Sequence, residues 1–302
     1  MEFTEHFAGL NIGEPSAAGG LKVFPLYPLH PAALEVALLA EAVARDDASI
    51  AEDAHADGPW FRRVVIDNRG KVAVLVRDGD LLLGGMQDRT AERSCVVPAQ
   101  ARVTVPALCV EQRRSHYAGR MDFAVSRTAA DPELRSTRVA ASMRGESLQE
   151  LTWSGVATRR ASAGIADESG SLRDVEERGA ARLKDLEARL PPVHLACGVA
   201  IAWTGRGGSV SLHVEIFGSA PACAGAWPGL VRAAAQCTRP KARAPRVSRT
   251  ELREIFSDAA AARFEDAPAV GAGQLRRADF GKGVATVLSL DGNLVHASLF
   301  AA

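Results

Sequence analysis

The sequence predicts an α+β fold, in which a largely antiparallel β-sheet precedes a C-terminal part of helices and β-hairpins. Three strand-like apolar runs follow one another in the N-terminal half, at residues 72–76, 81–83 and 103–110. The gaps between them are too short for the crossovers that a parallel sheet requires. Two Asp-Gly pairs, at residues 78–79 and 291–292, lie between apolar runs, a pattern typical of tight hairpin turns. We therefore expect neighbouring strands to run in opposite directions.

Length and charge limit the classes of protein to which the chain can belong. With 302 residues it is long enough for two domains, and we divide it into a β-rich region with a polar motif, residues 1–125, and a region of helices and hairpins, residues 126–302. The second region packs on the first, and one continuous domain is the alternative. Lysine and arginine total 36, and aspartate and glutamate also total 36, so no overall field attracts nucleic acid or an anionic membrane.

Targeting signals and cysteine usage both indicate a cytoplasmic protein. The N-terminal segment MEFTEHFAGL lacks the basic and apolar parts of a signal peptide, and no later apolar run reaches the roughly 18 residues of a membrane span. The cysteines number 5, which is odd, and no two of them form a C-x-x-C pair. This usage favours buried reduced thiols, and predicts neither a disulfide framework nor a metal site.

Three elements are predicted before and at the start of the sheet. Residues 21–29 alternate in polarity but contain Pro25 and Pro28, which cannot donate to a β-ladder, so we expect an edge strand. Residues 32–44 repeat apolar side chains at spacings of three and four, which predicts a helix. Within residues 48–63 we expect a short strand and a loop.

The C-terminal part begins with residues 126–170, where glycine and proline interrupt a modest apolar content and no element is assigned. Residues 171–190 then carry a long apolar stripe, and two prolines follow them. Ser171 and Asp174 have the spacing of a capping pair at the start of this helix. It is the clearest helix in the sequence.

The remaining elements alternate between hairpins and helices. They are predicted at residues 193–203 and 209–217 (strands), 227–237 and 248–264 (helices), and 284–290 and 294–300 (strands). Ser248 and Glu251 have the spacing of a capping box, which marks the start of the second helix. Residues 238–247 are basic and contain prolines, so we expect an exposed linker.

No catalytic signature in the sequence names a reaction. The chain lacks G-x-x-x-x-G-K-[ST], H-E-x-x-H, G-x-S-x-G and an EF-hand loop, and its GAG at residues 271–273 lacks the third glycine of a dinucleotide-binding loop. His213 and Glu215 lie two apart on one face of a predicted strand and could act as an acid/base pair. Solvent-facing strand residues are the more common explanation of this pattern.

The polar segment after Gly84 and Gly85 is the stronger candidate for a binding site. Glycines allow a ligand to approach the backbone, and Arg89 offers a planar fork for phosphate or carboxylate. Gln87 and Asp88 can bind hydroxyls or the edge of a base. An internal network of salt bridges and turn caps explains the same residues about equally well.

Four segments, spread over nearly the whole chain, carry a resemblance to a known family. They read DGDLLLGGMQDR, VPALCVEQRR, EIFGSAPACAGAWPGLVRAA and VHASLF. In this order they resemble the ARG and Rhodanese-Phosphatase-superfamily-associated domain, a family found beside enzymes that process ADP-ribose and related NAD-derived nucleotides. Asp80 stands where the family typically has glutamate, and Ser115 stands where it typically has tryptophan.

The resemblance implies binding, with or without processing, of an ADP-ribose-like or NAD-derived nucleotide, and no cofactor. The candidate ligand-binding residues carried over by position are Gly84, Gly85, Gln87, Asp88, Arg89, Glu111, Arg114 and His296. A non-catalytic interaction or scaffold protein is the alternative. A ligand site should leave Arg89 and Glu111 lining an open cavity, whereas a structural network should bury and pair them.

Overall fold

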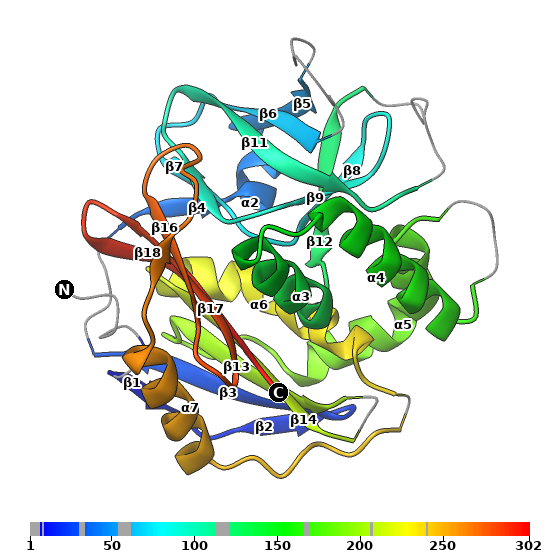
Figure 1. Cartoon of the computed structure of the whole chain (residues 1–302), viewed down its shortest axis with the longest axis vertical. Coiled ribbons are helices and arrows are strands. Elements are labelled where there is room, and N and C mark those ends of the chain that lie inside the picture. Colours follow the sequence, from blue (N-terminus) through cyan, green and yellow to red (C-terminus); the bar gives the residue numbers. More distant parts are fainter. Residues whose placement is uncertain are drawn as a thin grey trace.

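The computed structural model of the chain describes residue 7 and residues 9–29, 34–53, 62–112, 121–165, 170–205, 208–239 and 241–302. Helices combine in them with mainly antiparallel sheets, which confirms the predicted α+β fold (Figure 1). None of the helices described is both long and apolar enough to cross a membrane.

The largest sheet joins strands that are far apart in the sequence. It is 9-stranded and antiparallel, in the order β1-β3-β13-β14-β18-β17-β16-β15, with β2 beside β3. Its strands are β1 (Leu10–Ile12), β2 (Ser16–Ala18), β3 (Leu21–Pro28), β13 (Gly198–Thr204), β14 (Val210–Phe217), β15 (Glu265–Asp266), β16 (Gln274–Asp279), β17 (Gly283–Leu290) and β18 (Asn293–Ala301). Because β3 pairs with β13, the predicted N-terminal region contributes strands to more than one sheet. The division into domains at residue 125 stays a prediction.

β3 is an interior strand, although its prolines predicted an edge strand. β1 pairs with residues 26–28 of β3, and β2 pairs with residues 21–23. Pro25 therefore lies opposite the gap between β1 and β2, where no ladder bond requires the N–H that proline lacks. Its carbonyl faces the same gap and accepts a hydrogen bond from the backbone N–H of Gly13 at 2.9 Å.

A second β region contains a 6-stranded sheet, in the order β12-β8-β9-β11-β6-β5, and a 3-stranded sheet, in the order β10-β7-β4. The pairs are antiparallel except that of β4 with β7, which is parallel. The strands are β4 (Val36–Leu38), β5 (Ala48–Glu52), β6 (Arg63–Asn68), β7 (Ala73–Val76), β8 (Asp80–Gly84), β9 (Arg89–Ala91), β10 (Cys95–Val97), β11 (Ala101–Cys109) and β12 (Phe123–Ala129). The three strands predicted in this region are confirmed as β7, β8 and β11.

The predicted turn at Asp78 and Gly79 forms, but it does not close a hairpin. Gly79 adopts φ +86°, a left-handed conformation that suits glycine. The flanking strands do not pair with each other: β7 pairs with β4 and β10, whereas β8 pairs with β9 and β12. The turn therefore carries the chain from one sheet to the next.

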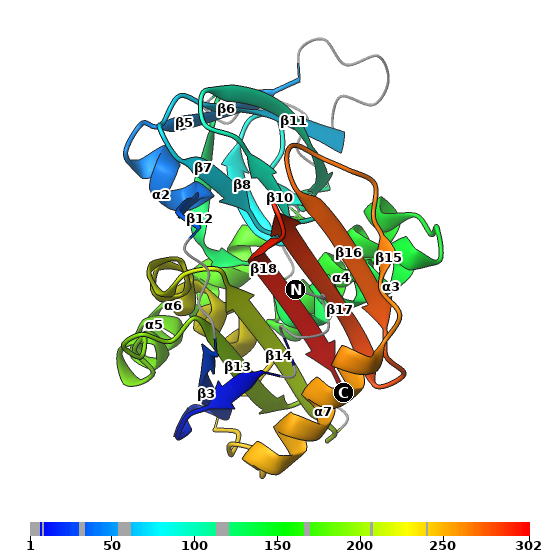
Figure 2. The ribbon, with the colours of Figure 1, turned by 90° about the vertical axis from the view of Figure 1, so that its left-hand side faces the viewer.

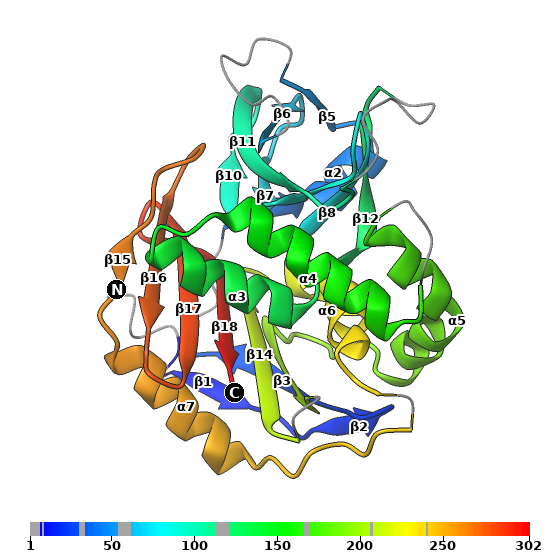
Figure 3. The ribbon, with the colours of Figure 1, turned by 45° about the vertical axis from the view of Figure 1, so that its right-hand side comes forward.

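Helices pack on both faces of the large sheet and against the second β region. They are α2 (Leu39–Ala44), α3 (Pro132–Met143), α4 (Leu148–Ser162), α5 (Arg173–Arg189), α6 (Ala220–Gln236) and α7 (Arg249–Ala261). α7 packs on one face of the large sheet (Figure 2), and α5 and α6 pack on the other. Figure 3 shows α3 and α4 between the large sheet and the second β region.

Three of the helix predictions need correction. The helix predicted at residues 32–44 is the strand β4 followed by the short α2, because the run of Val36 to Leu38 is buried between β7 and its other neighbours. The unassigned residues 126–170 contain α3 and α4. α6 begins at Ala220 rather than near residue 227, since Ser219 caps it by accepting a hydrogen bond from the backbone N–H of Ala222.

The other two predicted helices, α5 and α7, differ in how their N-termini are capped. α5 forms as predicted, but the N-cap position is Leu172, which makes no side-chain capping hydrogen bond, so the predicted capping pair is wrong. α7 has the predicted capping box: Ser248 accepts from the N–H of Glu251, and the Glu251 carboxylate accepts from the N–H of Ser248. The two predicted C-terminal hairpins, β13–β14 and β17–β18, also form.

Candidate functional site

The predicted residues after β8 lie together in the structure. The backbone N–H of Gly84 donates to the Asp88 carboxylate at 2.8 Å, and the N–H of Asp88 donates to the Glu111 carboxylate at 3.1 Å. A Cβ at Gly85 would lie 2.6 Å from the carboxylate of Glu52, so glycine is required for packing there. We call this group the predicted cluster; it comprises Glu52, Gly84, Gly85, Asp88, Arg89 and Glu111. Gln87 is half-buried beside it, and Arg114 lies outside the described residues.

Arg89 and Glu111 are buried and paired in the predicted cluster. The Arg89 side chain is 0% exposed, and its Nη2 lies 2.5 Å from the Glu52 carboxylate while Nη1 donates to the carbonyl of Arg63 at 3.0 Å. Glu111 is 7% exposed. Asp88 forms an ion pair with Arg173 at 2.8 Å. This is the arrangement expected of a structural network, and ligand binding by these residues stays a prediction.

His296 lies away from these residues, in a second group of polar side chains that we call the buried network. The network joins β14, β18, α3 and the loops that flank β8 and β9, and it lies between the large sheet and the second β region. Its members are all buried, and they are Asp78, Ser94, Arg135, Arg138, His213, Glu215, His296 and Ser298.

Glu215 is the centre of the buried network. One of its carboxylate oxygens lies 2.7 Å from Nη1 of Arg135 and 2.8 Å from Nε2 of His213, and it accepts a hydrogen bond from Ser298 at 3.2 Å. The other oxygen accepts a hydrogen bond from Nε2 of His296. Four side chains therefore converge on one carboxylate.

Asp78 extends the buried network toward the second β region. Its carboxylate lies 3.2 Å from Nε of Arg135 and 2.5 Å from Nη2 of Arg138. Its backbone N–H donates to the hydroxyl of Ser94 at 2.9 Å. Arg135 thus bridges two carboxylates, one from the turn after β7 and one from β14.

The charges of the buried network fix the ionisation of its members. Burial alone would raise the pKa of Glu215, but the Arg135 guanidinium and the neighbouring histidines hold that pKa well below its usual range. Burial lowers the pKa of His213, and Arg135 lowers it further, against the opposing effect of Glu215. Glu215 is therefore ionised beside Arg135, while His213 stays neutral.

The solvent-facing interpretation of His213 and Glu215 is wrong, because both residues are buried. β14 is an interior strand of the large sheet, and α3 covers the face to which these side chains point. The close contact of the two side chains, predicted from their spacing, is present at 2.8 Å.

A small cavity of about 30 Å³ borders the buried network. We call it the arginine pocket; its lining includes Asp78, Glu92, Arg93, Ser94, Arg138 and Arg277. The Nε atoms of Arg138 and Arg277 are buried and have no hydrogen-bond partner among the residues described. Burial and the nearby Arg93 lower the pKa of Arg277 from its ordinary value, against the opposing effects of Glu265 and Glu92.

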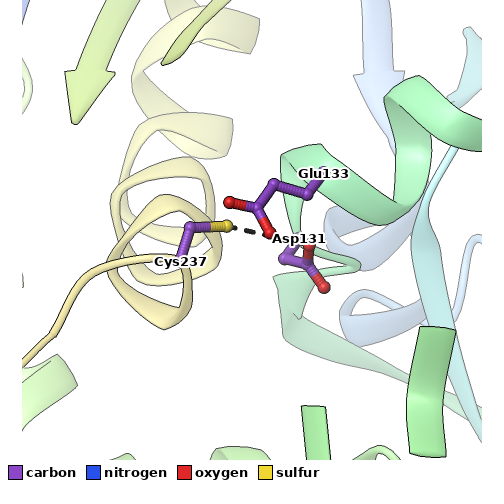
Figure 4. A group of neighbouring side chains, drawn as sticks. All are labelled: Asp131, Glu133 and Cys237. Atoms are coloured by element: carbon purple, nitrogen blue, oxygen red, sulfur yellow. Dashed lines mark hydrogen bonds between the residues drawn. The ribbon is translucent and has the colours of Figure 1, made fainter. Parts of the chain in front are cut away.

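A third group resembles a metal site by its ligand types alone. Figure 4 shows Asp131, Glu133 and Cys237, whose potential ligand atoms lie within 4.8 Å of one another. The Asp131 carboxylate is already bound by Arg159 and by the backbone N–H of Leu134. Burial raises the pKa of Cys237 well above its usual value, and its thiol donates to Asp131. A protonated thiol and an occupied carboxylate suit a link between α3 and α6 better than a metal site.

Most residues of the buried network have no local signal in the sequence. Ser94 and His296 are 202 positions apart, and Asp78 was explained by its turn alone. Arg135 and Arg138 fall in the segment where no helix was assigned. Their spacing of three, which places two side chains on one helical face, is the signal that could have identified them.

Comparison with known proteins supports the family resemblance in the sequence. Residues 9–300 match the ARG and Rhodanese-Phosphatase-superfamily-associated Protein domain. No curated protein and no solved structure matches the chain. The match covers both the predicted cluster and the buried network, so both belong to the family's domain.

Proposed function

Because the chain belongs to the ARG and Rhodanese-Phosphatase-superfamily-associated domain family, we propose that it binds a phosphate-bearing nucleotide of the ADP-ribose type at the arginine pocket. The observation that carries this proposal is the set of three arginines around one cavity, Arg93, Arg138 and Arg277, two of which have a buried Nε without a partner among the described residues. A phosphate group at this cavity would place acceptor oxygens beside these arginines.

The chemistry of the pocket suits an anion. Guanidinium groups bind phosphate through paired N–H donors, and such charge-assisted bonds are stronger than neutral ones. Asp78 and Glu92 also line the pocket, but Asp78 is shared by Arg135 and Arg138, and Glu92 is paired with Arg93. A bound anion would therefore add negative charge beside Arg277, whose Nη1 donates to the Ser142 hydroxyl at 2.7 Å.

The size of the cavity decides which part of the ligand enters it. About 30 Å³ holds roughly two water-sized groups, so a whole nucleotide does not fit. Arg277 is half-buried and Arg93 is also partly accessible, so a phosphate can bind at the mouth while the rest of the nucleotide stays outside.

The predicted cluster has a supporting role in this proposal. β9 carries Arg89, and the next residue, Thr90, accepts a hydrogen bond from Nη1 of Arg138 at 3.4 Å. Fixing Arg89 between Glu52 and the Arg63 carbonyl therefore fixes the strand that positions Arg138. The residues predicted from the sequence hold the pocket in place rather than contact the ligand.

A non-catalytic scaffold is the second candidate function. The observation that favours it is the burial and internal pairing of Arg89 and Glu111, the arrangement expected if the polar residues only stabilise the fold. A scaffold would show no selective affinity for phosphate-bearing ligands.

Isothermal titration calorimetry with ADP-ribose, ADP and adenosine tests the proposal. The first two should bind and adenosine should not. Arg277→Gln should weaken ADP-ribose binding about tenfold or more, since a charge-assisted bond contributes roughly 1.5–3 kcal/mol. Arg276→Gln is the matched control, because its side chain pairs with Asp266 instead of lining the pocket. If ADP-ribose and ADP fail to bind the wild type, the scaffold function is favoured.

A further inference from the structure

We infer that Ser94, His296 and Glu215 form a nucleophile, base and carboxylate relay with which the chain hydrolyses short-chain acyl esters in the arginine pocket. This activity goes beyond the binding of a nucleotide and does not depend on which alcohol the ester contains. It is carried by the contacts of one serine, by the cavity beside it and by an arginine that lines that cavity.

The three side chains make two consecutive hydrogen bonds. The Ser94 hydroxyl lies 3.2 Å from Nδ1 of His296, and Nε2 of the same ring contacts the Glu215 carboxylate. Because an ionised carboxylate only accepts, Nε2 carries the proton of the ring and Nδ1 is left to accept the proton of Ser94. The hydroxyl also accepts a bond from the N–H of Asp78, which fixes its position and leaves its proton for His296.

The surroundings hold His296 in this orientation. The ring of Phe217 packs against it with centroids 5.1 Å apart and an interplanar angle of 51°. Glu215 is in turn held by Arg135, His213 and Ser298. A base that is oriented by a third, fixed group is the arrangement that activates a serine hydroxyl.

The arginine pocket supplies space and a donor for the reacting carbonyl. Ser94 lines the cavity, which has room for roughly two water-sized groups, about the size of an acetyl group. Arg138 lines the same cavity with a buried Nε that has no partner among the described residues. An N–H donor at a buried position stabilises the negative charge that develops on a carbonyl oxygen during attack.

The reaction proceeds in two balanced halves. The Ser94 oxygen attacks the ester carbonyl carbon while Nδ1 of His296 takes the serine proton, and the carbonyl electron pair moves to oxygen beside Arg138. Collapse breaks the bond to the alcohol oxygen, which leaves with the proton from His296. Water then attacks the acyl-Ser94 ester, His296 takes its proton and returns it to the serine oxygen, and the carboxylic acid leaves.

Hydrolysis of p-nitrophenyl acetate by the full chain is the first test. We expect saturable release of p-nitrophenolate, and Ser94→Ala should reduce kcat/KM by about 100-fold or more because the nucleophile is lost. Ser289→Ala is the control, since Ser289 is a buried serine on β17 outside the pocket, and it should leave the rate within about twofold. Equal rates in wild type and Ser94→Ala would overturn the inference.

Labelling of the wild type with a fluorophosphonate identifies the nucleophile without relying on a variant. Trypsin releases Ser94 in the peptide of residues 94–102, SCVVPAQAR, in which it is the single serine. Mass spectrometry should find the label on this peptide after a short exposure. Labelling of other peptides, with residues 94–102 unmodified, would overturn the inference. This result does not depend on whether Ser94→Ala folds, because the wild type is labelled.

Glu215 acts as a positioning residue, and its role has its own test. Glu215→Asp keeps a carboxylate and should retain more kcat than Glu215→Gln, with KM within about threefold of the wild type in both variants. Equal kcat in the two variants would overturn the positioning role. Nucleotide binding is measured separately by calorimetry, so a protein that cleaves the ester but binds no ADP-ribose would refute the proposed function alone.

Discussion

The predicted cluster and the buried network are built from the same residue types but differ in what their charges face. In the predicted cluster, Arg89 is enclosed by Glu52 and a backbone carbonyl, and its neighbours bind one another. In the buried network, Arg138 reaches Asp78 with Nη2 and also lines a cavity. A side chain enclosed by its partners stabilises the fold, whereas one that lines a cavity can also contact a ligand.

Replacing Arg135 is the change with the largest expected effect. Arg135→Met leaves the carboxylates of Asp78 and Glu215 buried without their shared partner, so the free energy of unfolding should fall by about 3–5 kcal/mol in urea denaturation. Arg45→Met, which removes an exposed pair with Asp47, should change it by less than about 1 kcal/mol. Similar values for the two variants would mean that the buried network does not stabilise the fold.

Arg89→Lys should separate stability from binding. The lysine keeps a charge near Glu52 but loses the fork that also reaches the Arg63 carbonyl, so the free energy of unfolding should fall by about 1–3 kcal/mol. Calorimetry on the folded variant should give an affinity for ADP-ribose within about threefold of the wild type. A tenfold loss of affinity at unchanged stability would instead make Arg89 a ligand residue, as the sequence suggested.

Glu176, near the predicted cluster, gives that region its own pH dependence. Burial raises the pKa of Glu176 to about 7, against opposing effects of Ser126 and nearby arginines. A raised pKa in the folded state means that stability is present at low pH and is lost as the pH rises through about 7. Glu176→Gln should therefore raise the free energy of unfolding by about 1–3 kcal/mol at alkaline pH and leave it unchanged near pH 4.

The buried network should respond to pH in the opposite direction. The pKa of Glu215 is held well below its usual range, so its contribution is present at neutral pH and is lost as the pH falls below the unfolded value of about 4.5. Denaturation of Glu176→Gln and of the double variant Glu176→Gln/Glu215→Gln across this range compares proteins with and without that loss, since Asp131 contributes equally to both. Equal decreases of stability in acid would contradict the ionised state of Glu215.

Cleavage in the segment of residues 238–247 should have the smallest effect. Its basic residues are exposed, and trypsin should cut first after Arg243, because Lys241 and Arg243 precede alanine. The cut separates the covalent chain between Glu215 and His296, but β14 still pairs with β18 through residues 212–217. The nicked protein should therefore elute intact on gel filtration. Early cutting elsewhere would show that this segment is packed.

Elements with local signals could be predicted from the sequence, and those defined by distant contacts could not. The capping box of α7 and the turn between β17 and β18 depend on neighbouring residues, and both were predicted. α3 was missed because its buried face carries Arg135 and Arg138 beside Leu134, so no apolar stripe marks it. The buried network was missed for the same reason, because the partners of its charged side chains lie on elements that are distant in the sequence.

The predicted cluster shows the limit of motif reasoning at a site. The short segment between β8 and β9 brings Gly84 and Asp88 into hydrogen-bond contact, and Arg89 follows at the start of β9, opposite Leu82. The direction in which Arg89 points depends on Glu52, which lies 37 positions away. Sequence spacing therefore predicted the place of the cluster but not whether its arginine faces a ligand or another side chain.

The separation of Ser94 and His296 in the sequence also delays their contact during protein synthesis. A ribosome adds roughly 5–20 residues per second, so the 202 positions between them correspond to about 10–40 s. During that interval the second β region can form while its serine still lacks the histidine. The strand β18 is made after α7 and β17, so the contact between hydroxyl and imidazole can form only after the large sheet receives this strand. Under the proposed hydrolysis, Ser94 therefore lacks its base until residue 296 has been made.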